Sequence, residues 1–130
     1  GIDPNPSMVS FARRNFKEKA KFYVSSIESW DDISEIVFCC GIFTKKLNTH
    51  DYEVEELFER FLKMCKRIKA KTIVFNTMSC FCNKKDSNLY YPNMKKLNDI
   101  IFDFFSYRVE NFLIVNNHIK YEFIWKFNVN

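Results

Sequence analysis

A nearly unbroken apolar run, residues 35–43, is the feature that most constrains how this chain folds. Such a run is typical of a strand that is buried on both faces of a parallel sheet. Apolar side chains then recur at three- and four-residue steps from Val54 to Ile68, which predicts an amphipathic helix. A second apolar run follows at residues 71–77. The order strand, helix, strand predicts an α/β fold with a mostly parallel sheet.

A helix is also expected near the amino end of the chain. Asn5 is a good cap, and Pro6 suits the first helical position, where an N–H group is not needed. Apolar residues then recur on one face of this segment. A short strand is expected at residues 21–24, and residues 27–34 are expected to form a loop or one turn of helix.

The carboxyl-terminal third predicts one more helix and two strands. The helix face runs from Met94 to Phe105, and the strands are residues 111–115 and 121–129, separated by a turn at Asn116, Asn117 and His118. Two adjacent strands at the end of the chain favour an antiparallel hairpin. The complete expectation is a Rossmann-like, mostly parallel sheet with helices on both faces and a C-terminal antiparallel hairpin.

Composition restricts the class of protein and its partners. The chain has 130 residues, of which 47% are hydrophobic, and a net charge of only +4, so it is expected to form a globular domain rather than to be disordered. Its two glycines, Gly1 and Gly41, are too few for a glycine-rich phosphate loop. The basic residues between positions 63 and 71 share a helix with a strong apolar face, so a solvated surface is expected there and nucleic acid is not expected as a partner.

The five cysteines do not point to a metal or to a disulfide framework. Adjacent strand residues such as Cys39 and Cys40 point to opposite faces and share a metal poorly. The pair Cys80 and Cys82 lacks a second pair or a nearby histidine. No signal peptide and no apolar run of about 20 residues is visible. We therefore expect free thiols, no metal, no membrane partner and a cytoplasmic location.

The amino-terminal residues indicate a ligand. Gly1, Ile2 and Asp3 read as the end of a buried strand with a carboxylate at its tip, ahead of a turn and a capped helix. In nucleotide-binding α/β sheets a carboxylate at this place accepts hydrogen bonds from ribose hydroxyls. The alternative is an Asp that forms a turn beside Pro4. Because the chain opens within this element, we expect it to be the carboxyl-terminal part of a larger cofactor-binding domain.

Three stretches, in this order and spacing, resemble class I S-adenosylmethionine (SAM)-dependent methyltransferases from the end of their second strand onward. Gly1 to Ala12 is similar to the acidic strand end and helix start of that family, and Phe38 to Phe43 to its fourth strand. Phe75 to Ser79, followed by Asn88 to Pro92, is similar to the fifth strand and its loop in one bacterial subgroup. The resemblance covers nearly the whole chain and implies one partial methyltransferase domain, residues 1–130, without the first strand and its glycine-rich loop.

The resemblance also implies roles for particular residues. Asp3 would bind the ribose hydroxyls of SAM, and Ser26 and Ile27 would flank the adenine. The methionine part and the methyl group would lie against Cys40, Gly41 and Phe43. At the position of Ser26 the family often has an Asp, which binds the adenine amine more strongly than a serine does. Without the glycine-rich loop, the chain alone is expected to bind SAM poorly and to be inactive.

The acceptor side is less defined by the sequence. The bacterial subgroup favours a small-molecule or sugar-like methyl acceptor, and the sequence does not identify a general base or an oligomeric state. His50 lies just before the long helix, where Thr49 or Asp51 could instead act as a simple cap. Tyr90 and Tyr91 lie on a loop expected to overhang the carboxyl edge of the sheet, where they either face the acceptor or pack against the helix.

Two other functions remain open at this point. The absent glycine-rich loop and Ser26 fit a degenerate, non-catalytic methyltransferase-like module that binds a partner or acts as a scaffold. A nicotinamide-dependent Rossmann enzyme would also place an acidic residue after its second strand. The expected antiparallel hairpin argues against the nicotinamide enzyme.

Overall fold

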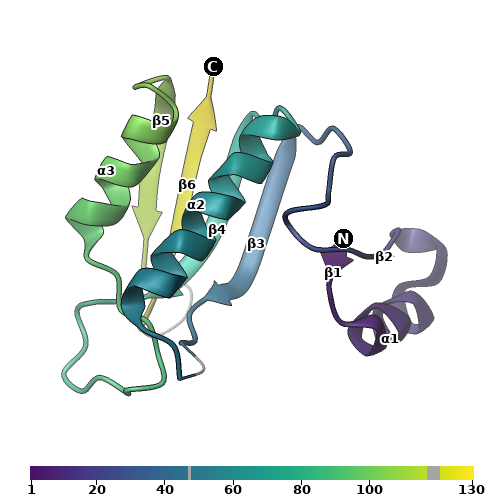
Figure 1. The fold of residues 1–130 in the computed structure, drawn as a ribbon, viewed down its shortest axis with the longest axis horizontal. Coiled ribbons are helices and arrows are strands. Elements are labelled where there is room, and N and C mark those ends of the chain that lie inside the picture. Colours follow the sequence, from purple (N-terminus) through teal and green to yellow (C-terminus); the bar gives the residue numbers. More distant parts are fainter. Residues whose placement is uncertain (47, 117–120) are drawn as a thin grey trace.

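The computed structural model describes residues 1–46, 48–116 and 121–130 (Figure 1). The described part of the chain contains, in order, β1 (Ile2–Asp3), α1 (Pro6–Phe16), the 3₁₀ helix η1 (Lys17–Lys19), β2 (Tyr23–Val24), β3 (Ile36–Phe43), α2 (Asp51–Arg67), β4 (Thr72–Met78), α3 (Met94–Phe104), β5 (Val109–Val115) and β6 (Glu122–Val129). All the helices and strands expected from the sequence are present. The expected turn residues Asn117 and His118 lie outside the described residues.

Capping side chains set the beginnings of the helices. The Asn5 side chain accepts a hydrogen bond from the backbone N–H of Ser7 at 2.9 Å, and Pro6 is the first residue of α1, as expected. The N-cap of α2 is His50 rather than Thr49 or Asp51, so that expectation was wrong. The Glu53 carboxylate accepts a hydrogen bond from the backbone N–H of His50 at 2.7 Å. A carboxylate in the first turn satisfies an N–H group that has no partner within the helix, and its charge complements the helix dipole.

The described strands form two sheets. The four-stranded sheet has the order β3-β4-β6-β5, with β3 parallel to β4 and the other neighbours antiparallel. The antiparallel pairing of β5 with β6 confirms the expected C-terminal hairpin. β1 pairs in parallel with β2 alone. The single mostly parallel sheet expected from the sequence is thus interrupted, because β1 and β3 do not pair with each other in the described part of the chain.

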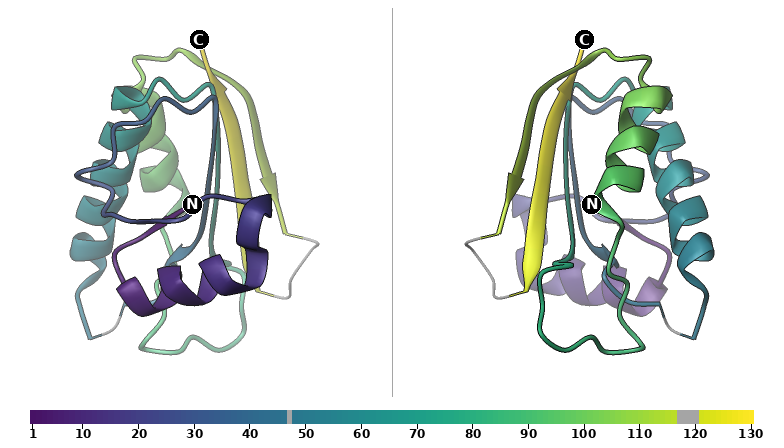
Figure 2. Two further views of the ribbon diagram at one scale, coloured as in Figure 1. Left: turned by 90° about the vertical axis from the view of Figure 1, so that its right-hand side faces the viewer. Right: turned by 90° about the vertical axis from the view of Figure 1, so that its left-hand side faces the viewer.

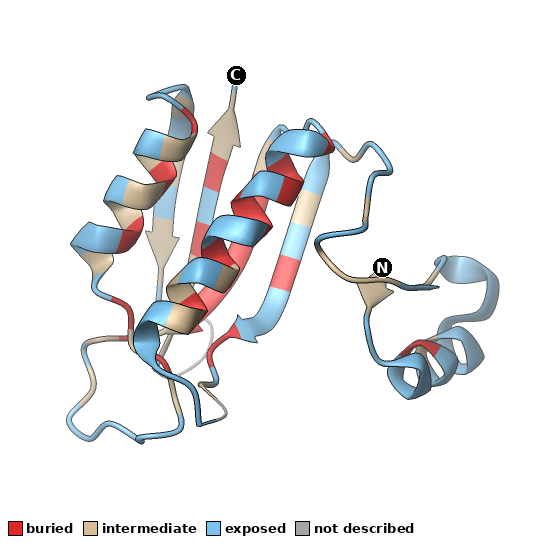
Figure 3. Cartoon of the chain, viewed as in Figure 1, coloured by how far each residue is buried: buried red, intermediate tan, exposed pale blue. Residues whose placement is uncertain are grey.

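α2 and α3 lie on the same face of the four-stranded sheet (Figure 2). Both connect parallel strands, and the chain moves in one direction from β3 to β4 and on to β5, so right-handed connections place both helices on one side. α1 packs against β1 and β2 instead. Helices on both faces of the sheet were expected, but of the described helices none covers the other face of β3, much of which is coloured as exposed in Figure 3. Phe38 of this strand is 69% exposed.

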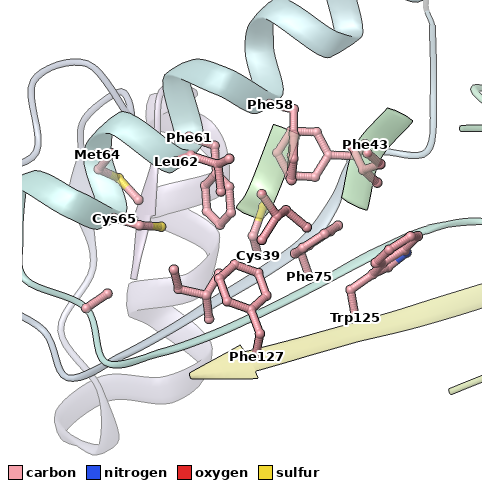
Figure 4. Close-up of a cluster of buried hydrophobic side chains, with 14 of the residues drawn as sticks. Cys39, Phe43, Phe58, Phe61, Leu62, Met64, Cys65, Phe75, Trp125 and Phe127 are labelled. Carbon is pink, nitrogen blue, oxygen red and sulfur yellow. The ribbon is translucent and has the colours of Figure 1, made fainter. Parts of the chain in front are cut away.

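An aromatic core joins α2 to this sheet (Figure 4). The Phe43 ring makes edge-on contacts with the rings of Phe58, Phe61 and Phe75, at centroid distances of 5.1, 5.3 and 5.8 Å. Phe75 also stacks on the fully buried Trp125 at 5.7 Å. Such contacts add stability beyond the area buried, so β3, β4 and α2 form a firm platform for the residues at the strand ends. No helix in the described ranges is long and apolar enough to cross a bilayer.

Candidate functional site

A cavity of about 570 Å³ lies between the two sheets. Its walls come from the end of β1, the turn at residues 25–28, the length of β3 and the side of α2. The cavity includes the carboxyl ends of the parallel strands, which is where ligands bind in open α/β sheets. Four residues expected to contact a cofactor line it together: Asp3, Ser26, Ile27 and Cys40.

Asp3 occupies the end of β1, as expected. Its Oδ1 accepts a hydrogen bond from the N–H of Asn5 at 2.7 Å, and its backbone carbonyl accepts one from Ser25 at 3.2 Å. The first contact is the turn geometry that a purely structural Asp would show. The side chain also lines the cavity, and an ionised carboxylate can accept about four hydrogen bonds. The turn contact is therefore present, and it leaves further acceptor capacity on the Asp3 carboxylate.

The turn that carries Ser26 and Ile27 is held by an arginine from α2. Arg67 Nη2 donates to the backbone carbonyls of Ile27, Glu28 and Trp30, at 2.9, 3.0 and 2.8 Å. Its Nε also pairs with Asp31 at 2.6 Å. A planar guanidinium suits such a multiple contact better than a lysine does. In the sequence Arg67 is indistinguishable from the other cations that end this helix.

The hydroxyls of this turn form a small polar cluster. The Oγ atoms of Ser26 and Ser29 are 3.2 Å apart, and that of Ser25 is 3.1 Å from Ser29 Oγ. A hydrogen bond from Ser26 holds the pKa of the neighbouring Glu28 below its usual value, helped by the positive charges of Arg60 and Arg67. The cavity wall at this place therefore presents hydroxyls beside an ionised carboxylate, with the apolar side chain of Ile27 next to them.

The end of β3 contains a break in register that the sequence did not reveal. The pairing with β4 shifts between Cys39 and Phe43, and Gly41 has φ +85°, a conformation that other residues rarely adopt. The Gly41 N–H donates to Asn76 Oδ1 at 2.7 Å, and its carbonyl accepts from the Thr44 hydroxyl at 2.9 Å. β3 therefore continues past Gly41 to Phe43 through an irregular stretch of backbone.

This geometry separates the three β3 residues that were expected to line the cofactor pocket. Cys40 is exposed and lines the cavity, whereas Gly41 and Phe43 do not. The Phe43 side chain is 1% exposed because it belongs to the aromatic core under α2. Phe43 therefore does not reach the cavity in this structure, because its ring packs against Phe58, Phe61 and Phe75.

Asn76 is a further residue whose role only the structure shows. It is buried, and its Nδ2 donates to Glu122 Oε2 at 2.8 Å while its Oδ1 receives the Gly41 N–H. One amide thus ties the end of β3 to the start of β6 across β4. In the sequence, the only sign of this role is that Asn76 is a polar residue within an apolar strand. Buried polar groups are nearly always hydrogen-bonded, so such a residue indicates a specific partner.

The candidates for the acceptor side lie outside this cavity. His50 is exposed and stacks on Tyr52 at 5.6 Å. Tyr90 is buried, with its hydroxyl 3.5 Å from Glu55 Oε1, and burial together with nearby carboxylates raises its pKa. The Tyr91 hydroxyl accepts from the N–H of Asp86 at 3.0 Å. Both tyrosines therefore pack into the loop and helix in the described structure, the alternative that the sequence left open.

The cysteines are all free thiols in the structure. Cys39 and Cys65 are buried, and burial raises the pKa of Cys39 to about 12 and that of Cys65 further. These two thiols behave as small apolar groups in the core. Among the described residues, no group of three or more His, Cys, Asp or Glu side chains is arranged to hold a metal ion.

The sequence matches no known protein-family profile, and no curated protein matches it significantly. Solved structures do match over the whole chain. Magnesium protoporphyrin IX methyltransferase from Synechocystis PCC 6803, with bound S-adenosylhomocysteine (SAH), has a TM-score of 0.70 and 11% identity, and the chain covers 63% of it. The same enzyme with bound SAM has a TM-score of 0.66 and 12% identity, with 58% of its length covered.

Two further structures come from other organisms. The PH0226 protein of Pyrococcus horikoshii OT3 is matched over 100% of this chain and 70% of its own, at 13% identity and a TM-score of 0.64. A SAM-dependent methyltransferase of Leishmania major is matched over 98% and 53%, at 15% identity and a TM-score of 0.59. This chain is thus shorter than each of them. Its fold is that of class I SAM-dependent methyltransferases.

Proposed function

We propose that this chain is the carboxyl-terminal part of a SAM-dependent methyltransferase whose acceptor is a small or sugar-like molecule. The observation that carries the proposal is the position of Asp3, at the end of a parallel strand and in the wall of the cavity. The Synechocystis enzyme of the same fold was crystallised both with SAM and with SAH. The matching structure from Leishmania major is also a SAM-dependent methyltransferase, which further supports the proposal.

The residues that line the cavity fit the nucleoside part of SAM. The carboxylate of Asp3 has acceptor capacity for the ribose hydroxyls beyond its contact with Asn5. Ile27 offers an apolar surface for the adenine ring, and Ser26 a hydroxyl for its edge. Arg67 holds the turn that carries them through the backbone carbonyls of Ile27 and Glu28. These residues would therefore bind and orient the nucleoside.

When it is bound, SAM supplies an activated methyl group that a nucleophile of the acceptor attacks in line. The contribution of the protein to such a reaction is mainly orientation and exclusion of water. Cys40 lies at the cavity wall near the end of β3, on the side where the reactive part of the cofactor would extend. The irregular backbone at Gly41, fixed by Asn76, sets the path of the chain at that place.

The proposal is tested by calorimetric titration of SAM into the chain and into the longer polypeptide that its gene encodes upstream of Gly1. We expect the longer polypeptide to bind SAM, to prefer it to NAD, and to bind it far more tightly than residues 1–130 do. In the longer polypeptide, Asp3→Asn keeps the turn and removes the charge, so it should weaken SAM binding about 10- to 100-fold. Asp32→Asn, the same change in an exposed loop, should leave the affinity unchanged.

Failure of both polypeptides to bind SAM would contradict the proposal and support the alternative, a non-catalytic module with this fold. An unchanged affinity in Asp3→Asn would also contradict it, because Asp3 would then be only a turn residue. Methyl transfer is then measured with radiolabelled SAM and a panel of small hydroxylated and amino acceptors. Incorporation into a macromolecule alone would overturn the acceptor class.

A further inference from the structure

We propose that a second cavity, at the amino end of β4, binds a small molecule that carries two or more linked phosphate groups. This basic cavity has a volume of about 370 Å³ and lies among the ends of α2, α3 and β6. Figure 1 shows the ends of α2 and β6 at the same end of the sheet. The basic cavity shares no lining residue with the cavity that contains Asp3, so the inference does not rest on the proposed function.

Backbone hydrogen bonds gather basic residues around this cavity from parts of the chain that are far apart in sequence. The basic residues that line it are Lys66, Lys69, Lys71 and Arg108. The N–H of Val129 donates to the Lys71 carbonyl at 2.8 Å, and the N–H of Asn130 donates to the Arg108 carbonyl at 3.1 Å. The end of β6 therefore joins the connection before β4 to the connection before β5, and it fixes where Lys71 and Arg108 leave the backbone.

The positive charge of the basic cavity is largely uncompensated. Of the described residues that line it, none has an acidic side chain. Lys71 pairs with Glu35 at 2.8 Å, whereas no ion pair in the described part of the chain includes Lys66, Lys69 or Arg108. A hollow lined by charges of one sign concentrates ions of the opposite sign. The basic cavity therefore favours an anion.

The helix dipole accounts for only part of this cluster. Lys66 lies in the last turn of α2, where a cation complements the carboxyl end of a helix, and Lys69 follows closely. The effect of the dipole falls off within one turn. Lys71 directly precedes β4 and Arg108 directly precedes β5, so both lie outside the helices. Their presence beside the two lysines of the helix end needs another reason, which a bound anion supplies.

Linked phosphate groups match the charge of this cavity. Lysine and arginine side chains both donate charge-assisted hydrogen bonds to phosphate oxygens. A single carboxylate carries too little charge for four cations, whereas linked phosphate groups carry several negative charges within a short length. The floor of the cavity includes the buried side chains of Ala70 and Phe105. This apolar floor lowers the local dielectric and strengthens the attraction.

The size of the cavity favours a small ligand over a nucleic acid. Pockets for small molecules typically have volumes of about 300–1,000 Å³, and the basic cavity lies within this range. Nucleic acids are bound instead along a basic track that follows the backbone over several nucleotides. The four cations surround one hollow.

Calorimetric titration with sodium tripolyphosphate tests the site in the complete polypeptide that the gene encodes. We expect saturable binding at one site, and an affinity that falls about 5-fold or more when NaCl is raised from about 50 to about 200 mM, because exposed charges are screened by salt. Inorganic orthophosphate should bind about 10-fold or more weakly than tripolyphosphate. Absence of saturable binding, or equal affinities for the two ions, would overturn the proposal.

Paired substitutions test whether the binding needs these residues. Lys69→Gln with Arg108→Gln should weaken the binding of tripolyphosphate about 10-fold or more, because two of the charged donors are lost. Lys84→Gln with Lys126→Gln removes the same charge from exposed positions outside the cavity, and the affinity should stay within about 2-fold. Equal losses in the two pairs would show a response to net charge alone and would overturn the site. Thermal unfolding verifies that each variant is folded, and Lys66→Gln with Lys69→Gln replaces the first pair if that pair is not.

Nuclear magnetic resonance locates the bound anion. Tripolyphosphate should shift the amide signals of residues 69–71, 105–108 and 129–130. Shifts confined to Asp3 and the end of β3 would place the anion in the other cavity and overturn the proposal. Single-stranded RNA of about ten nucleotides is titrated as a second ligand. If RNA bound about 10-fold more tightly than tripolyphosphate, and lost affinity in the variant with Lys69→Gln and Arg108→Gln, the small-ligand proposal would be overturned in favour of a nucleic acid.

None of these measurements uses SAM. Loss of SAM binding with tripolyphosphate binding intact would contradict the methyltransferase alone, and the reverse result would contradict the phosphate site alone.

Discussion

The amide of Asn76 supports a prediction that can be worked out from its contacts. Its Oδ1 accepts from the Gly41 N–H at 2.7 Å and its Nδ2 donates to Glu122 Oε2 at 2.8 Å. The substitution Asn76→Asp preserves the shape and the acceptor toward Gly41. It replaces the donor toward Glu122 by a second carboxylate, so that one hydrogen bond is lost and two negative charges face each other.

The expected magnitude follows from these two effects. A hydrogen bond to a charged group contributes about 1.5–3 kcal/mol. Two carboxylates at about 3–4 Å repel each other further, and rotation of the half-exposed Glu122 relieves part of this repulsion. We expect Asn76→Asp to lower the free energy of unfolding by about 2–4 kcal/mol. Glu122→Gln alone exchanges a charged acceptor for a neutral one and should cost about 1 kcal/mol.

The double variant, Asn76→Asp with Glu122→Gln, decides whether the cause is this contact. The side-chain amide introduced by Glu122→Gln would donate to the new carboxylate at position 76, so the pair is restored with reversed polarity. Urea unfolding followed by circular dichroism should show a double variant within about 1 kcal/mol of the unmodified chain, and a coupling energy of about 2 kcal/mol or more. Additive losses, with a coupling below about 0.5 kcal/mol, would refute the reasoning.

Three further predictions concern the core and the helix caps. Asn93 accepts from the N–H of Lys96 at 3.1 Å at the start of α3, so Asn93→Ala should cost about 1 kcal/mol in thermal unfolding, whereas Asn93→Asp should not; equal losses would count against capping. Trp125 Nε1 donates to the buried Thr77 hydroxyl at 2.9 Å, so Trp125→Phe should lower the free energy of unfolding in urea by about 2–3 kcal/mol. Adding Thr77→Val should restore about 1 kcal/mol of it, because no buried hydroxyl is then left without a partner, and no recovery would contradict the contact. Burial raises the pKa of Cys39 to about 12, so the unfolded chain loses the thiol proton at a lower pH than the folded chain and the free energy of unfolding falls as pH rises from about 8.5 toward 12. Cys39→Ala should reduce this dependence of the unfolding free energy on pH by up to about 1.4 kcal/mol per pH unit, and an unchanged dependence would show that another group titrates.

Several elements could be predicted because their cause is local. The capped start of α1 at Asn5 and Pro6 depends on residues within one turn. The long helix α2 follows from apolar residues at three- and four-residue steps, and its packing onto the sheet buries that face. β6 likewise follows from alternation, since Phe123, Trp125 and Phe127 share the buried face.

The candidate site was only partly predictable. Asp3, Ser26, Ile27 and Cys40 do line one cavity, since strand ends and the turns after them gather at one edge of a parallel sheet. Phe43 instead packs into the core under α2, and Tyr90 is buried with its hydroxyl 3.5 Å from Glu55 of α2. These outcomes require knowledge of which face of an element is covered, and by what.

What the sequence by itself determined is the kind and order of the elements and the strand end at which Asp3 stands, because helix caps, periodicity and apolar runs act within a few residues. The tertiary structure decided the rest. Arg67 holds a turn about 40 positions earlier in the chain, and Asn76 joins β3 to β6. These contacts join groups that are far apart in sequence, and their partners are chosen by packing, which brings many distant segments together at once.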